Sequence, residues 1–277
     1  MWGLFIKMFM ADNLARIVDP IFAGPPPYQG IKVILATYAF TFQIYGDFAG
    51  YSKIARGLGK CMGFDIMVNF NLPFFATNPR EFWRRWNISL SGWLRDYLYI
   101  PLGGSRGGQF RTYRNILITM LLAGLWHGAN WTFIAFGAYW AMLMVFYRLL
   151  KPLFQHIPHS GNTLGRKILF IVKVAFFFQL TSIGFIIFRA ESISQAFSML
   201  SCLKTISFFP PETKKMILEL ISYLWVVAII SIIQFYKRDS LAMNKWPFAV
   251  TAMLHSLLFY LMFFNSWPGT KFIYFAF

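Results

Sequence analysis

The sequence predicts an all-α fold, a multi-pass transmembrane helical bundle that includes re-entrant or interfacial helices. Hydrophobic residues make up 57% of the 277 residues and charged residues only 13%, against about 25% charged in a typical soluble domain. The mean hydropathy is positive, at +0.52. Three apolar runs, 168–188, 218–236 and 248–264, each approach the length of about 20 residues that a helix needs to cross a bilayer.

The net charge of +16 comes from 26 basic and 10 acidic side chains. In a soluble protein this charge would suggest a nucleic-acid partner, but here the basic residues are scattered between apolar runs. The positive-inside bias and attraction to anionic headgroups account for the charge, so no nucleic acid is expected. The two cysteines, Cys61 and Cys202, have no spacing that suggests a disulfide framework or a metal site, and no metal is expected.

The first third of the chain is expected to contain two helices and an irregular segment. Residues 1–20 are apolar and look like the end of a helix entered from elsewhere, and the prolines at 25–27 stop that helix. A second helix is expected over 31–45, with an interruption at the small and polar residues of 46–51. Residues 61–79 mix aromatic residues with Asn and Pro and predict irregular backbone or a half-inserted loop.

The middle of the chain carries the segment FWRRWNISLSGWLRDYLYIPLGG, residues 82–104. Because Trp and Arg side by side favour the headgroup level, it predicts an amphipathic or re-entrant helix. The apolar run at 116–147 is too long for one straight crossing and contains a break at 128–130, so it predicts one tilted helix or two helices that meet there. We expect one membrane domain over 1–277 with about six or seven embedded segments.

His127 is the most informative single residue. It lies in the sequence LWHGA inside the apolar run, and a titratable ring in a membrane-length stretch marks a functional site by default. Histidine suits a general base because its ordinary pKa of about 6.5 lies near the working pH. A structural alternative is that His127 caps the helix break by bonding a free carbonyl. The residues alone leave both interpretations open.

Other polar residues have simpler interpretations. His156 and His159 lie in a loop without a Cys or carboxylate nearby to complete a metal site. Asp96 follows Arg95 and is interpreted as a local ion partner rather than a catalytic acid. Asp47 is interpreted as a structural cap in preference to a substrate contact.

Two long motifs, FWRRWNISLSGWLRDYLYIPLGG and AGLWHGANW, resemble a known family. They are similar to the bacterial alginate O-acetylase type of the membrane-bound O-acyltransferase (MBOAT) superfamily. The stretches GLFIKMFMADNLA, YAFTFQIYGDFAGYS, NFNLPFFATNPREFWRRW, IIFRAES and FIYFAF agree with it, so the resemblance covers essentially the whole chain. It implies a helical bundle in which an acyl-donor tunnel meets an acceptor funnel at His127. Family members carry further helices before the GLFIKMF stretch, so the chain resembles their C-terminal part.

The resemblance also implies roles for individual residues. It makes His127 the catalytic base, and Asn87, where the alginate type usually has a second histidine, a hydrogen-bond donor to the oxyanion or an orienting group for the acceptor. Trp86 and Trp126 either line the tunnel or anchor the chain at the membrane interface. Three arginines either hold the phosphates of the acyl donor or extend toward lipid headgroups: Arg84, Arg85 and Arg95.

The function implied by the resemblance is O-acetyl transfer from a cytoplasmic donor, expected to be acetyl-CoA, to hydroxyls of an exported polysaccharide such as alginate. No tightly bound cofactor is expected. The expected partners are the acyl donor, the polysaccharide, membrane lipids and an extracytoplasmic acyltransferase partner protein, and the expected location is the bacterial inner membrane.

Other functions stay open. The same mechanism would serve peptidoglycan O-acetylation or teichoic acid D-alanylation. Alternatives of other classes are an inactive truncated remnant or membrane scaffold, and a transporter or channel with a proton or solute path at the broken helix around His127.

Overall fold

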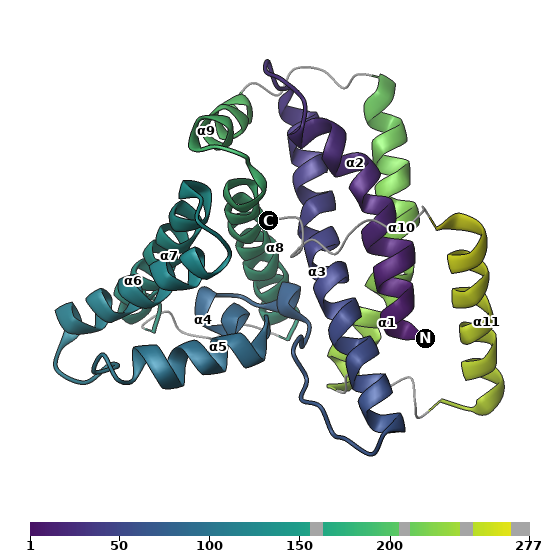
Figure 1. Cartoon of the computed structure of the whole chain (residues 1–277), viewed down its shortest axis with the longest axis horizontal. Helices are drawn as coiled ribbons and strands as arrows, with labels where there is room; N and C mark the ends of the chain where they lie inside the picture. The colour runs from purple at the N-terminus through teal and green to yellow at the C-terminus, as the bar shows by residue number, and fades with distance from the viewer. Residues whose placement is uncertain (156–162, 205–210, 239–245, 267–277) are drawn as a thin grey trace. The chain divides into compact units, whose positions relative to one another are not determined.

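A computed structural model describes residues 1–155, 163–204, 211–238 and 246–266 (Figure 1). Every regular element in these ranges is helical, which confirms the predicted fold class. The chain divides into two compact units: residues 1–71 together with the chain from 198 onward, and residues 72–197. His127 and Asn87 both belong to the second unit.

Four helices of the described ranges are long and apolar enough to cross a membrane. They are α7 (Trp131–Gln155), α8 (Thr163–Arg189), α10 (Pro211–Lys237) and α11 (Phe248–Asn265). The last three contain the apolar runs on which the fold class was predicted. The sequence therefore locates these spans correctly, because an uninterrupted apolar run of membrane length has few other stable solutions.

The first unit begins with a helical segment made of α1 (Trp2–Leu4), the π-helical η1 (Phe5–Ala11) and α2 (Asp12–Phe22). It ends just before the prolines, as predicted. Helix α3 (Gly30–Cys61) follows and packs along this segment (Figure 1). Helix α2, with 11 residues, is too short to cross a membrane, and α3 is not among the four apolar spans. The described residues therefore show four membrane-length spans, against the six or seven embedded segments expected.

The predicted interruption at residues 46–51 was wrong, because α3 is helical throughout that range. Its glycines permit close packing instead of a turn. A Cβ atom on Gly46 would lie 2.9 Å from the Ile6 carbonyl oxygen, and one on Gly50 would lie 2.9 Å from the Cβ of Lys7. Small residues at such positions let two helices approach to backbone contact.

A buried ionic cluster lies at this contact between η1 and α3. The Nζ of Lys7 is 2.7 Å from Oδ1 of Asp12 and 2.6 Å from Oδ1 of Asp47. Lys7 is 8% exposed, and each carboxylate is 2% exposed. Asp47 therefore serves as an ion partner rather than as the cap that the sequence suggested, and its polarity is balanced inside the fold.

The second unit starts with irregular backbone, in agreement with the prediction for residues 61–79. The short η2 (Pro73–Phe75) is followed by α4 (Pro79–Trp83), α5 (Ile88–Leu94) and the π-helical η3 (Arg95–Tyr99). The expected single amphipathic or re-entrant helix over 82–104 is thus a series of short helices.

Two long helices, α6 (Gln109–Trp126) and α7, lie side by side after these short ones (Figure 1). They confirm the two-helix interpretation of the run at 116–147, with the break where the sequence placed it. Helix α8 packs against α7. The short α9 (Ile193–Cys202) follows α8.

The Lys7 cluster gives the first prediction. Lys7→Met leaves two buried carboxylates without their cation, and breaking a buried pair in this way destabilises a protein by about 3–5 kcal/mol. We expect a lower thermal unfolding midpoint, followed by tryptophan fluorescence of the detergent-purified protein. Asp47→Asn should be milder, because Lys7 keeps Asp12.

Lys60→Met is the matched control, since Lys60 is exposed in the last turn of α3. Equal unfolding midpoints for Lys7→Met and Lys60→Met would show that the cluster does not stabilise the fold.

Candidate active site

His127 lies directly after α6, at the break before α7. Its backbone N–H donates to the Gly124 carbonyl at 3.0 Å. Gly128 follows with φ of 149°, a conformation that favours glycine. The side-chain oxygen of Asn130 accepts from the N–H of Thr132 at 3.0 Å and so caps the start of α7. Gly128 and Asn130 thus account for the break, which weakens the interpretation of His127 as a structural cap.

Two glycines hold α6 and α7 together near His127. A Cβ atom on Gly124 would clash with the carbonyl oxygen of Phe133, and one on Gly137 would clash with that of Met120. The backbones of the two helices are therefore in direct contact. This contact fixes the end of α6, and with it the position of His127.

Aromatic rings surround the partly buried His127 side chain. Trp126 and Phe188 contact its ring edge-to-face, with centroid distances of 4.9 and 5.0 Å, and Phe133 and Phe136 lie at 6.0 and 6.2 Å. Burial lowers the pKa of His127, which lies outside the four apolar spans, to about 4. The ring is consequently neutral at pH 7 and has a nitrogen that can accept a proton.

Asn87 is a buried residue in an unusual backbone conformation. It is 3% exposed and precedes α5 with φ of 42° and ψ of 59°, in the left-handed region. Asparagine tolerates this region better than most residues, and such strain is found disproportionately at functional sites. The hydroxyl of Ser89 donates to Oδ1 of Asn87 over a long 3.5 Å.

A continuous aromatic cluster connects the neighbourhoods of Asn87 and His127. Trp86, next to Asn87, lies 5.4 Å from Phe185 of α8. Phe185 lies 6.2 Å from Phe136 of α7, and Phe136 lies 6.2 Å from His127. The structure thus brings the two predicted catalytic residues, which are 40 positions apart in the sequence, to one cluster of rings.

Comparison with known proteins identifies the family of the chain. A family model described as MBOAT, membrane-bound O-acyltransferase family, matches residues 3–189. The chain belongs to the membrane-bound O-acyltransferase family. The matched range contains both His127 and Asn87 together with the whole aromatic cluster between them.

Three relatives show where the chain falls among the acyltransferases of this family. A probable alginate O-acetylase of Azotobacter vinelandii is 43% identical over 86% of this chain and 47% of its own length. A probable alginate O-acetylase of Pseudomonas aeruginosa is 48% identical over 72% of this chain and 36% of its own. A peptidoglycan O-acetyltransferase of Helicobacter pylori is 35% identical over 72% of this chain and 36% of its own length. The chain thus matches less than half the length of these relatives.

The two tryptophans that directly precede Asn87 and His127 differ in their surroundings. Trp86 is 5% exposed and stacks on Phe82 at 5.4 Å, so it is a core member of the aromatic cluster. Trp126 is 53% exposed although its ring touches that of His127. An exposed ring beside a catalytic candidate is compatible with both predicted roles, lining the tunnel and anchoring at the interface.

Two of the three arginines expected to bind the donor already contact carboxylates. Arg85 lies 2.7 Å from Glu81, and Arg95 donates to both oxygens of Asp96 at 2.7 and 2.9 Å. The hydrogen bond from Arg95 holds the pKa of Asp96 below its ordinary value, in agreement with its predicted role as an ion partner. Arg84 is exposed. Donor binding by these arginines stays a prediction.

Sequence reasoning missed the phenylalanines and the tryptophan of α7 and α8 that form the aromatic cluster around the candidate site. Phe133, Phe136 and Trp140 are spaced three and four apart on α7, and Phe185 and Phe188 are three apart on α8. This spacing places each set on one helix face, so helical periodicity within the aromatic residues was the available signal. His156 and His159 lie outside the described residues.

The α6–α7 contact gives the second prediction. Gly137→Ala inserts a methyl group against the backbone of α6, and overpacking of this kind destabilises by about 1–3 kcal/mol. We expect a lower unfolding midpoint. The added methyl group also pushes α6 away from α7 and so displaces His127 at the end of α6. Any acyltransferase activity should therefore fall further than the loss of folded protein explains.

Gly57→Ala is the control, since a Cβ atom there meets nothing within 4 Å. It should stabilise helix α3 by up to about 1 kcal/mol. A Gly137→Ala protein as stable as Gly57→Ala would mean that the two backbones are not in contact.

Proposed function

We propose that this chain carries the catalytic site of a membrane O-acetyltransferase that acts on an exported polysaccharide, with His127 as the general base. The observation that carries the proposal is the position of His127, at a helix break and among four aromatic rings, inside the region matched by the MBOAT family model. Acetyl-CoA is the proposed donor. Acetyl transfer to a sugar hydroxyl needs such a base because a hydroxyl is a weak nucleophile at neutral pH.

The proposed reaction moves one proton twice. A ring nitrogen of His127 accepts the proton of the acceptor hydroxyl while its oxygen attacks the thioester carbonyl, which forms the new C–O bond. Collapse of the tetrahedral intermediate breaks the C–S bond. The imidazolium then returns the proton to the thiolate of the departing donor, and His127 is neutral again.

Asn87 is proposed to stabilise the negative charge of that intermediate. Its side-chain amide is a neutral donor, and its residue is fixed in a buried, left-handed conformation. Donors that are ordered before the reaction lose little energy in reorganisation, which is why they favour the transition state. The aromatic cluster excludes water from the surroundings and strengthens the interaction.

The similarity to alginate O-acetylases supports a polysaccharide acceptor, since these relatives are 43% and 48% identical. Peptidoglycan is the second candidate acceptor because the Helicobacter pylori enzyme is 35% identical. An exported acceptor places the protein in the bacterial inner membrane, where an extracytoplasmic partner protein would receive or deliver the acetyl group. Both the location and the partner are part of the proposal.

The third prediction tests the base. In a strain from which the gene is deleted, the wild-type chain should restore O-acetyl groups, and His127→Ala should lower their formation by about 100-fold or more, the usual contribution of a general base. The O-acetyl content is measured separately on surface polysaccharide and on peptidoglycan after release by mild alkali. The fraction that responds identifies the acceptor.

His255→Ala is the matched control, because His255 is an exposed histidine on α11. It should keep wild-type activity at equal protein levels in the membrane. Full activity of His127→Ala would exclude the proposed mechanism. Loss of activity in the wild type as well, with the protein present in the membrane, would favour the inactive remnant or scaffold.

The fourth prediction separates the amide of Asn87 from its backbone strain. Glycine adopts the left-handed conformation without penalty, so Asn87→Gly removes the amide and keeps the turn. We expect kcat to fall by about 100-fold, as for the loss of one oxyanion donor, with a smaller change in KM. Acetyl transfer to an oligosaccharide acceptor by the purified protein measures both.

Asn87→Ala should show the same loss of kcat and a lower unfolding midpoint, since alanine is strained in this conformation. An Asn87→Gly protein within twofold of wild-type kcat would leave Asn87 with a structural role alone.

A further inference from the structure

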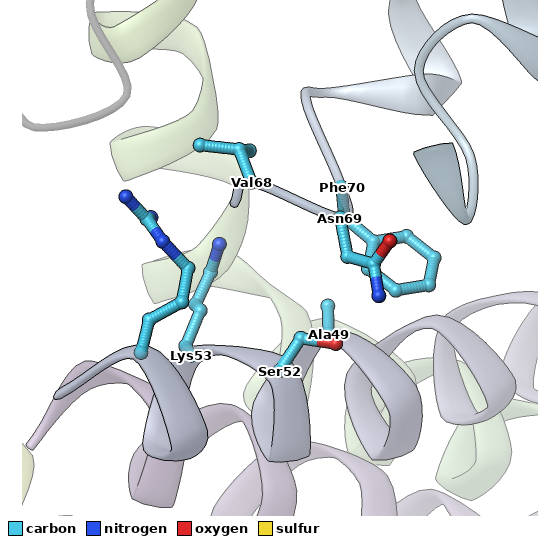
Figure 2. Close-up of a pocket in the computed structure, with 7 residues that line it drawn as sticks. Ala49, Ser52, Lys53, Val68, Asn69 and Phe70 are labelled. Atoms are coloured by element: carbon cyan, nitrogen blue, oxygen red, sulfur yellow. The ribbon is translucent and has the colours of Figure 1, made fainter. Parts of the chain in front are cut away.

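A small pocket lies in the first unit, between the C-terminal half of α3 and the segment that follows it (Figure 2). It is a shallow hollow that opens to solvent. Ser52, Lys53 and Arg56 line it from α3, and Asn69 and Phe70 line it from the other side. None of these residues belongs to the candidate active site, so the proposed acetyl transfer gives the pocket no role.

The pocket contains two neighbouring cations. Lys53 and Arg56 are three residues apart on α3 and therefore share a face of the helix. Arg56 donates from Nε to the carbonyl oxygen of Ile66 at 2.9 Å, which fixes its guanidinium beside the following segment. In the part of the chain that the structure describes, no ion pair joins Lys53 to a carboxylate.

The surroundings of Lys53 disfavour an unaccompanied positive charge. Burial and the nearby charge of Arg56 lower the pKa of Lys53 to about 8. The contrast with Lys7 is informative, because that buried lysine has two carboxylates within 2.7 Å. A bound anion would supply the charge that the described residues do not provide around Lys53.

Hydrogen-bonding groups around the pocket suit an oxyanion. Figure 2 shows Lys53 reaching from α3 toward the segment that contains Val68, with Asn69 and Ser52 nearby. An ammonium, a guanidinium, an amide and a hydroxyl can all donate to oxygen. Lysine and arginine together are the usual donors to phosphate. We propose that this pocket binds the phosphate group of an anionic ligand, with Lys53 and Arg56 as its cationic donors.

A membrane phospholipid is one source of such a phosphate, and a soluble phosphate compound is the other. Large apolar side chains are exposed at the end of α3 and just after it: Leu58, Met62, Phe64 and Met67. Basic residues next to exposed apolar ones are typical of surfaces at the headgroup level of a bilayer. The lipid source is therefore favoured, and the experiment separates the two.

The test, which is the fifth prediction, measures binding to the detergent-purified chain by shifts of the unfolding midpoint. The probes are dioctanoyl phosphatidylglycerol, dioctanoylglycerol, inorganic phosphate and coenzyme A. Phosphatidylglycerol should stabilise the wild type and dioctanoylglycerol, which lacks the phosphate, should not. Lys53→Met should weaken binding about tenfold or more, the effect of losing one charged hydrogen bond, while Lys53→Arg should retain it.

Lys60→Met is the matched control, because Lys60 carries the same charge on the same helix and does not line the pocket. Lys53-dependent binding of phosphatidylglycerol alone supports a lipid ligand, and Lys53-dependent binding of inorganic phosphate or coenzyme A supports a soluble one. The proposal is overturned if no phosphate-bearing probe distinguishes Lys53→Met from wild type, or if Lys60→Met weakens binding equally.

A second measurement uses the wild-type protein and so does not depend on the folding of a variant. Reductive methylation at pH 7.5 should modify Lys53 readily, since its lowered pKa leaves a substantial neutral fraction. Saturating phosphate-bearing probe should slow methylation of Lys53 several-fold, read from peptides by mass spectrometry, and leave Lys60 unchanged. Equal rates at Lys53 with and without every such probe would also overturn the proposal.

Discussion

Direct contact between helix backbones at glycines is the constraint on which much of this structure depends. In the second unit, Gly124 and Gly137 leave no room for a side chain between α6 and α7. The helix break is therefore held in place, and His127 with it. In the first unit, Gly46 and Gly50 bring η1 against α3 closely enough for Lys7 to reach Asp47. Between apolar helices in a bilayer, such close packing replaces the hydrophobic effect as a source of association.

Two kinds of buried polar group in this fold avoid an unbalanced charge. The charges of Lys7, Asp12 and Asp47 satisfy one another, so the cluster needs no ligand and is interpreted as structural. His127 avoids the problem of a buried charge by remaining neutral, which is also what a general base requires. Lys53 belongs to neither kind, because its neighbour is another cation. This difference, rather than burial alone, is the reason that Lys53 is proposed as a ligand-binding residue and Lys7 is not.

The sequence predicted those features that depend on local composition. Membrane-length apolar runs identify α8, α10 and α11, and the glycine at 128 with the asparagine at 130 identifies the end of the α6–α7 hairpin. Prediction from the sequence failed where the local residue pattern favours one structure and packing against a distant segment favours another. Gly46 and Gly50 suggest a turn in the sequence, yet a helix partner makes them contact points. The Lys7–Asp47 pair could not be predicted because it joins residues 40 positions apart.

The aromatic cluster explains why the two motifs of the candidate site can act together although short helices and a glycine-rich segment separate them. The rings that lie between Trp86 and His127 come from outside both motifs, because Phe185 and Phe188 belong to α8 and Phe136 to the second turn of α7. The cluster makes the surroundings of His127 apolar and keeps its ring neutral. Asn87 is buried beside Trp86, a member of the same cluster, and an apolar environment of this kind strengthens the effect of a fixed donor. The chemistry of the two polar residues therefore depends on packing between helices that carry no polar candidate of their own.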